Sequence, residues 1–288
     1  MDFRTDLALE RCEFLGKTEI DGVEIEAFRD KKAKVSRINV VDERGEEAIG
    51  KPQGMYVTVE VAPFAKHAQF IDDSLDALTR EIKRLLPSDG SVLVAGLGNM
   101  KITPDALGPK CASMIFATRH ITGELLHQTG LENLRTVSSF STGVTGDTGA
   151  EALELIKGIA ETIKPNAVII IDALAARSVS RLGNTVQLCS TGIVPGSGVG
   201  NSRQEISEKT LGVPVIAIGV PTVVDAATLV ADYSGADRPD LPENAERMMV
   251  TPREVDMMVE RAAKLTALAI NCALQPDISP EDMLILTA

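Results

Sequence analysis

The chain has 288 residues, of which 44% are hydrophobic and 24% are charged, and its net charge is −12. This length suits one large α/β domain or two small ones, and the composition is ordinary for a globular protein. The acidic balance argues against direct contact with nucleic acid, whose phosphates bind Lys and Arg, but it leaves a basic protein open as partner or substrate.

The N-terminus carries no basic and apolar signal segment, and no apolar run is long enough to cross a bilayer. We therefore expect a cytoplasmic protein without membrane contact. The cysteines lie far apart and form no Cys-x-x-Cys pair, which predicts core thiols in a reducing compartment rather than disulfides or zinc ligands. These cysteines are Cys12, Cys111, Cys189 and Cys272.

The first 70 residues are predicted to be rich in β-strand. Asp21-Gly22 lies between alternating apolar residues, which is a hairpin signal. Residues 34–41 and 55–61 are rich in β-branched side chains. We expect residues 7–70 to form a β-rich N-terminal part that is integrated with the core.

Helices and strands alternate from Asp72 onward. Apolar residues at helical spacing predict a helix that begins near Asp72 and ends before Pro87. Similar patterns predict strands at 92–95, 136–140, 168–171, 186–188 and 213–218, and helices from 104, over 149–163 and over 252–274. Continuously apolar strands separated by helices require a mostly parallel sheet covered on both faces. We expect one α/β domain over residues 1–288, with 234–246 as a polar surface loop.

Two aspartates, Asp105 and Asp172, follow two of these predicted strands. In open parallel α/β sheets, chemistry collects outside the carboxyl ends of the strands. Each aspartate also has a structural explanation. Asp105 suits the dipole of a helix capped by Thr103, and Asp172 could pair with Arg177 or with Arg181, since an unpaired buried charge is costly.

Small residues mark other possible parts of a site. The run 96–99 fails the dinucleotide fingerprint because Lys101 occupies the place of its third glycine, so we expect its glycines to provide a sharp turn instead. The loops 141–149 and 195–201 suit pocket walls or close contact with another chain. Asp225 follows the last predicted strand, where it could support the site or begin a helix.

Other catalytic chemistries find little support in the sequence. His67, His120 and His127 have no metal-ligand spacing, and no Gly-x-Ser-x-Gly elbow is present. Nothing favours Cys111 or Cys189 as a nucleophile. We therefore expect no metal and no cofactor. Two acids that share a proton are the main chemistry left.

Four segments resemble the germination protease family: residues 96–109, 170–177, 195–201 and 219–226. The resemblance extends from residues 4–8 to 249–256. The family's members are endopeptidases that degrade small acid-soluble spore proteins during germination. The resemblance implies a three-layer α/β/α sandwich of the phosphorylase/hydrolase type, related to the hydrogenase-maturation peptidases. It also implies a homotetramer in the spore core, with Asp105 and Asp172 as the essential pair of an atypical aspartic peptidase.

The resemblance further implies a zymogen that cleaves its own N-terminus at a site similar to its substrates, where an acid precedes an apolar residue and alanine. Thr5-Asp6-Leu7-Ala8 fits this pattern, which predicts a cut between Asp6 and Leu7 that releases residues 1–6.

In the mechanism that we expect, one aspartate takes a proton from water while the other polarises the scissile carbonyl. The sequence does not assign these two roles. One alternative is a metal-dependent peptidase of the hydrogenase-maturation type, which would need a histidine after the second acid, and the chain has no histidine after Asp172. A non-catalytic binding protein that uses the same crevice is the other alternative.

Overall fold

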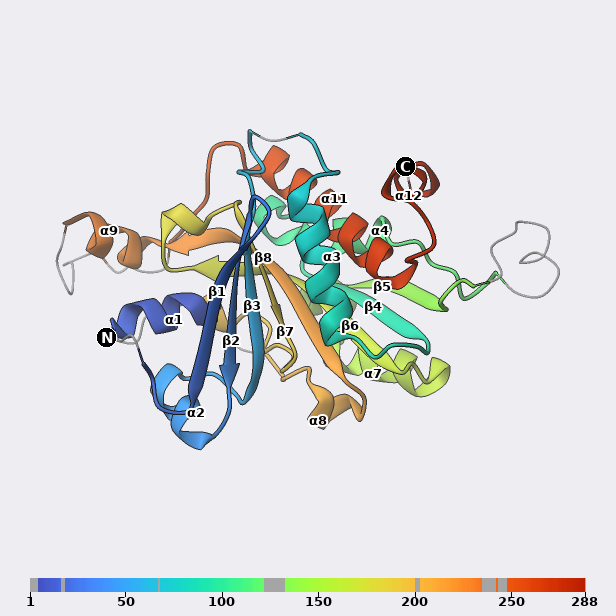
Figure 1. The fold of residues 1–288 in the computed structure, drawn as a ribbon, viewed down its shortest axis with the longest axis horizontal. Coiled ribbons are helices and arrows are strands. Elements are labelled where there is room, and N and C mark those ends of the chain that lie inside the picture. Colours follow the sequence, from blue (N-terminus) through green and yellow to red (C-terminus); the bar gives the residue numbers. More distant parts are fainter. Residues whose placement is uncertain are drawn as a thin grey trace.

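The computed structural model describes residues 5–16, 19–66, 68–121, 133–199, 203–234, 242 and 248–287. In this part of the chain the strands form one nine-stranded sheet, whose main path runs β1-β2-β3-β7-β8-β6-β4-β5, with β9 paired to β8 (Figure 1). The strands are β1 (Val23–Asp30), β2 (Ala33–Val40), β3 (Gly54–Glu60), β4 (Val92–Leu97), β5 (Val137–Gly143), β6 (Ala167–Ala176), β7 (Thr185–Cys189), β8 (Val215–Asp225) and β9 (Met249–Val250).

The sheet has a parallel part and an antiparallel part. Strands β5, β4, β6 and β8 run parallel to one another. The N-terminal strands β1, β2 and β3 join this sheet through β7, which is antiparallel to both β3 and β8. The prediction of an α/β fold with a β-rich N-terminal extension is therefore confirmed, and the extension continues the central sheet.

Helices cover both faces of the sheet, which gives three layers (Figure 1). One face carries α3 (Asp73–Leu85), α4 (Leu107–Ser113), α11 (Val255–Leu274) and α12 (Pro280–Leu286). The other carries α1 (Ala8–Leu15), α2 (Glu43–Ile49), α7 (Ala152–Ile163) and α8 (Glu208–Leu211). Alternate side chains of β4 and β6 enter separate apolar cores on the two faces, as a doubly covered sheet requires. In the described part of the chain, no helix is long and apolar enough to span a bilayer.

Two helices illustrate how local sequence fixes these elements. The side chain of Asp72 accepts the backbone N–H groups of Ser74 and Leu75 at the start of α3, and Lys83 and Arg84 occupy its last turn, where cations suit the helix dipole. The alanine-rich helix α11 is buried along most of its length, because small side chains let it pack closely against α3 and α4.

The first 70 residues contain two helices that we did not predict. The carboxylate of Asp42 accepts two backbone N–H groups at the start of α2, and a left-handed glycine ends both α1 and α2. Each helix has eight residues or fewer, which is too short for a clear periodic signal. Asp21-Gly22 connects only an isolated Ile20–Val23 bridge, and the long β1–β2 hairpin turns at 31–32 instead.

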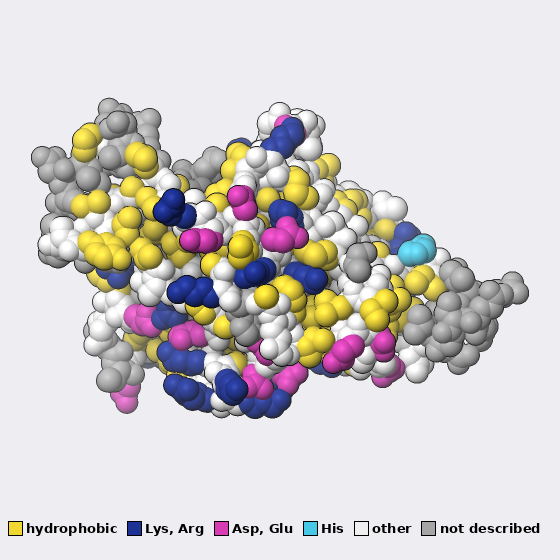
Figure 2. All heavy atoms as spheres, turned by 90° about the horizontal axis from the view of Figure 1, so that it is seen from above, with side chains coloured by type: hydrophobic (Ala, Val, Ile, Leu, Met, Phe, Trp, Pro, Cys, Tyr) yellow, Lys and Arg dark blue, Asp and Glu magenta, His cyan; other side chains and the backbone are white. Residues whose placement is uncertain are grey.

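The surface mixes charges of both signs. Figure 2 shows Lys and Arg side chains interspersed with Asp and Glu over the face seen from above, with no single basic patch on that face. Several large apolar side chains are also exposed, among them Val230 and Tyr233 of α9 (Ala226–Ser234) and Met248.

Candidate active site

The sequence predicted that Asp172 follows the end of a strand, but Asp172 lies inside strand β6. The strand continues to Ala176 because β8 pairs with it beyond Asp172, where Asp172 faces Gly219. On its other side, β6 loses its partner: β4 pairs only as far as Gly96, which lies opposite Ile171. Asp172 is thus the first residue of β6 beyond the end of β4, and its side chain faces the crevice at that edge.

Asp105 lies at the end of the short 3-10 helix Thr103–Asp105, which precedes α4. Thr103 is not the N-cap, because that position is taken by Ile102. The carboxylate of Asp105 turns back from the helix and accepts the backbone N–H of Asn99 at 2.8 Å. The prediction of Thr103 as the cap is therefore wrong. Asp105 does lie in the first turn of this short helix, as predicted, but its carboxylate binds Asn99 and faces the crevice.

Glycines bring α4 close to the sheet and so place Asp105. A Cβ atom at Gly96 would overlap the carbonyl of Gly108 in α4, and a Cβ atom at Gly108 would overlap carbonyls of β4 and β6. Gly98 has a φ of +110°, in the left-handed region that favours glycine. The expected sharp turn at 96–99 is confirmed.

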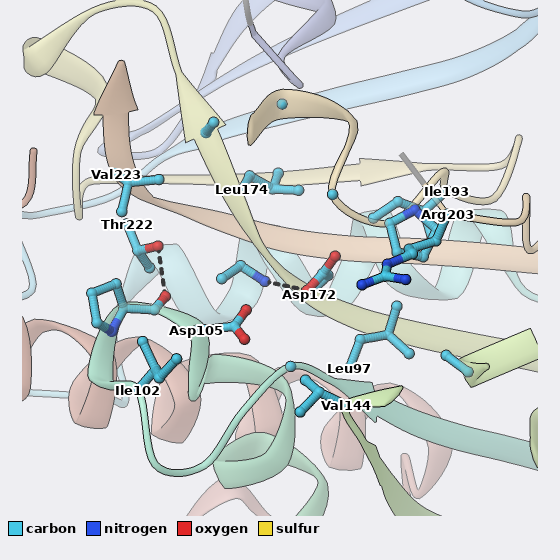
Figure 3. Close-up of a pocket in the computed structure, with 18 of the residues that line it drawn as sticks. Leu97, Ile102, Asp105, Val144, Asp172, Leu174, Ile193, Arg203, Thr222 and Val223 are labelled. Atoms are coloured by element: carbon cyan, nitrogen blue, oxygen red, sulfur yellow. Dashed lines mark hydrogen bonds between the residues drawn. The ribbon is translucent and has the colours of Figure 1, made fainter. Parts of the chain in front are cut away.

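The two carboxyl groups meet in a pocket of about 480 Å³. In Figure 3 both side chains border the same pocket, Asp172 from β6 and Asp105 from the short helix that precedes α4. Burial raises the pKa of Asp172 well above its usual value, and the negative charges of Asp105 and Asp6 raise it further. Burial also raises the pKa of Asp105, but the N–H of Asn99 opposes this change because it stabilises the ionised form.

The predicted arginine partners of Asp172 are engaged elsewhere. Arg181 bonds Glu13 and Glu60 at 2.6 and 3.0 Å, and Arg177 lies over the ring of Phe14. The side chain of Asp172 accepts its own neighbour's N–H, from Ala173. The pKa of Asp172 is thus set by desolvation and by other carboxylates, as in a site where two acids share a proton.

Both small-residue loops form walls of this pocket. Thr142, Gly143, Val144 and Thr145 line one side, and Pro195, Gly196 and Gly198 line another. The second loop was expected to let another chain approach closely, and the segment that approaches it is the chain's own N-terminus at Asp6.

Asp6 and Arg203 also line the pocket, and sequence reasoning did not place either of them there. Arg203 donates to Glu151 at 3.3 Å and reaches into the pocket in Figure 3. Its position shortly after the 195–201 loop was the only available signal. The signal for Asp6 was its place in the predicted processing sequence.

The remaining candidates lie outside this pocket. Asp225 is the last residue of β8 and accepts the N–H of Thr228 in α9, which favours the helix-start interpretation. All four cysteines are buried free thiols, as predicted. His120 is exposed, whereas His67, His127 and most of the 234–246 loop lie outside the described residues. Within the described residues, no group of three His, Cys, Asp or Glu side chains could hold a metal ion.

Comparisons of the sequence with protein families and with curated proteins agree on one family. A sequence profile described as germination protease matches residues 6–235. Curated proteins named germination protease are 40% identical in Caldanaerobacter subterraneus (98% of this chain, 97% of that protein), 41% in Clostridium tetani (98% of both) and 36% in Bacillus subtilis (97% and 95%). Among solved structures, a NiFe hydrogenase maturation protease of Thermococcus kodakarensis matches with a TM-score of 0.36 at 16% identity, over 66% of this chain and 98% of that one.

Proposed function

Since this chain belongs to the germination protease family and is a peptidase, we propose that it hydrolyses peptide bonds with Asp105 and Asp172 as a catalytic pair. The observation that carries the proposal is the burial of Asp172 beside a second carboxylate in one pocket. Two carboxyl groups at such close quarters do not both ionise readily, so one keeps its proton.

The surroundings of the two side chains support different roles for them. Asp105 is half-buried and accepts the N–H of Asn99, which favours its ionised form. Asp172 is only 7% exposed and faces two other negative charges, which favour its protonated form. We therefore assign Asp105 as the general base and Asp172 as the protonated group that polarises the scissile carbonyl.

The reaction follows from these protonation states. Asp105 takes a proton from water, and the resulting hydroxyl adds to the scissile carbonyl carbon while Asp172 donates a hydrogen bond to the carbonyl oxygen. When the C–N bond breaks, the proton held by Asp105 passes to the departing amine nitrogen. One water is consumed, one carboxylic acid and one amine are formed, and Asp172 keeps its proton.

The substrates that we propose are small acid-soluble spore proteins, degraded in the spore core during germination. Family membership supports this substrate class, and the acidic balance of this chain argues against direct contact with the DNA that such proteins bind. Processing between Asp6 and Leu7 belongs to the same proposal. So does a homotetramer, for which the exposed Val230, Tyr233 and Met248 offer apolar contact surface.

The test is incubation with a purified small acid-soluble spore protein, with the cut sites mapped by mass spectrometry. We expect cleavage by the wild type that EDTA does not affect, and losses of about 100-fold to 10,000-fold in Asp105→Asn and in Asp172→Asn. Asp147→Asn is the matched control, because Asp147 is exposed and pairs with Lys101. Full activity in either pocket variant would contradict the assignment, and EDTA sensitivity would favour metal chemistry.

A further inference from the structure

The N-terminal segment Thr5–Ala8 lies along β6 and presents an acidic side chain to the catalytic pocket. The N–H of Asp6 donates to the carbonyl of Ala175 at 3.0 Å. In return, the N–H of Ala175 donates to Asp6 Oδ2 at 2.9 Å, and the hydroxyl of Ser197 donates to Oδ1 at 2.9 Å. Each carboxylate oxygen therefore has its own donor.

The loop that holds this carboxylate has no room for a side chain at its centre. A Cβ atom at Gly198 would overlap Asp6 Oδ2 and would crowd Ala175. We call this place, formed by the Ala175 N–H, the Ser197 hydroxyl and Gly198, the carboxylate seat.

The residues after Asp6 are held just as closely. Leu7 is fully buried and packs with Leu174 and Ala176, with Leu182 and Ile193 at the edge of the cluster. The side chain of Gln187 spans the backbone on both sides of Leu7, since its Nε2 donates to the Asp6 carbonyl at 2.9 Å and its Oε1 accepts the Ala8 N–H at 2.9 Å.

Lys51 adds a second donor to the same carbonyl. Its Nζ lies 3.0 Å from the carbonyl oxygen of Asp6, and burial lowers the pKa of this ammonium group. These contacts thus hold three features of the segment: the carboxylate of Asp6, the apolar side chain of Leu7 and the backbone on both sides of Leu7.

The carboxylate seat opens onto the catalytic pair. Asp6 lines the pocket of Asp105 and Asp172 and also the neighbouring cavity of about 370 Å³ that contains Lys51 and Gln187. Leu174 and Ile193 line both cavities as well, so the N-terminal segment at Asp6 lies between the two cavities. A peptide in place of this segment would run beside both aspartates.

We propose that the carboxylate seat, with Gln187 and the pocket of Leu7, is the subsite that selects an acidic residue followed by an apolar one in the substrate. The chain's own Asp6-Leu7-Ala8 fills that subsite in this form of the protein. The proposal rests on the function proposed above, because it assigns specificity to the same site. Ser197 is then a specificity residue that contacts the substrate. Removal of Asp6 makes the carboxylate seat available to an acidic side chain of the substrate.

The experiment measures binding without cleavage, so that it does not depend on catalysis. The protein is the full chain with Asp6→Ala, which empties the seat, and Asp172→Asn, which prevents turnover. A fluorescent peptide with the sequence of residues 5–10 is compared with the same peptide carrying alanine in place of the aspartate. We expect the acidic peptide to bind at least about tenfold more tightly, and Ser197→Ala to remove about tenfold of its affinity, because a hydrogen bond to a charged group is lost.

Ser113→Ala is the control, since Ser113 is an exposed serine of α4 that bonds only a local carbonyl among the contacts described. Equal binding of the two peptides, or an equal effect of Ser197→Ala on both, would overturn the proposal. Failure to bind either peptide would overturn it as well. The proposed function is tested separately, by cleavage of the spore protein by the wild type. The wild type could cleave that protein even if the peptides showed no preference for an acidic residue.

Discussion

A Cβ atom at Gly98 would overlap the backbone carbonyl of Asp105. The left-handed turn at Gly98 therefore fixes the position of Asp105, because the backbone of Asp105 occupies the space that a side chain at position 98 would need. The carboxylate of Asp105 accepts the backbone N–H of Asn99, the residue that follows Gly98. The turn at Gly98 therefore contacts both the backbone and the side chain of Asp105.

Substitution Gly98→Ala should therefore reduce both activity and stability. We expect a loss of about 1–3 kcal/mol in the free energy of unfolding, because the positive φ and the overlap each add strain, and a larger relative loss of peptidase activity as Asp105 is displaced. Denaturant unfolding and cleavage rates measure the two effects. Gly158→Ala in α7 is the control: it has open space around it and lies in a helix, so it should be neutral or stabilising. A Gly98→Ala protein with the activity and stability of the wild type would contradict the link between the turn at Gly98 and the position of Asp105.

The pH dependence of kcat/KM should be bell-shaped. Activity requires Asp105 ionised and Asp172 protonated, so the rate should rise with pH as Asp105 loses its proton and fall again as Asp172 loses its own. Both limbs should lie above the usual aspartate pKa of about 3.9, since both pKa values are raised, and the falling limb should lie further above it. The profile is measured with a peptide substrate. Activity that is flat from pH 4 to pH 9 would rule out this pair of roles.

The same shift predicts how stability changes with pH. The folded protein holds the proton of Asp172 more tightly than the unfolded chain does, so this carboxyl favours the folded state at low pH, and that contribution is lost as pH rises toward the folded pKa. Asp172→Asn should therefore gain stability relative to the wild type between pH 4 and the folded pKa, by at most about 1.4 kcal/mol per pH unit. Unfolding curves at several pH values test this. An advantage of the wild type that grows with pH would contradict it.

Processing between Asp6 and Leu7 should be limited by release of the segment. Leu7 is fully buried and Gln187 holds the backbone on both sides of it, so the bond is protected in this form. Gln187→Leu should speed hydrogen exchange at the Ala8 amide and accelerate the cut, both followed by mass spectrometry under mildly acidic conditions. Asn184→Ala, in the preceding turn and bonded to Ser180, is the matched control. An intact Met1 after prolonged incubation of the wild type would rule out processing at this site.

The central fold and the aspartate pair were predictable because their signals are local and strong. Runs such as 167–171 are apolar and β-branched, and long helices such as α3 carry clear periodicity and capping. The sequence also has an aspartate close to each of two such strands, and the structure brings these two residues, Asp105 and Asp172, into one pocket.

Long-range pairing was not predictable from these patterns. Strand β6 continues past Asp172 because β8, more than forty residues later, provides hydrogen-bond partners for it, and no pattern near Asp172 encodes that pairing. The same is true of Asp6, whose contacts with Ala175 and Ser197 join segments that are 169 and 191 residues apart in the sequence. The short helices α1 and α2 were missed for a different reason, since they depend on caps and packing more than on periodicity.

The most direct test of the account is the pH titration of the Asp172 carboxyl, followed by infrared difference spectroscopy between the wild type and Asp172→Asn. We predict a protonated carboxyl band that is absent from the variant and that persists above the usual aspartate pKa of about 3.9. Its titration should move to lower pH in Asp105→Asn, where the neighbouring negative charge is removed. A band that titrates at or below the usual aspartate pKa and does not change in Asp105→Asn would contradict the shared-proton mechanism.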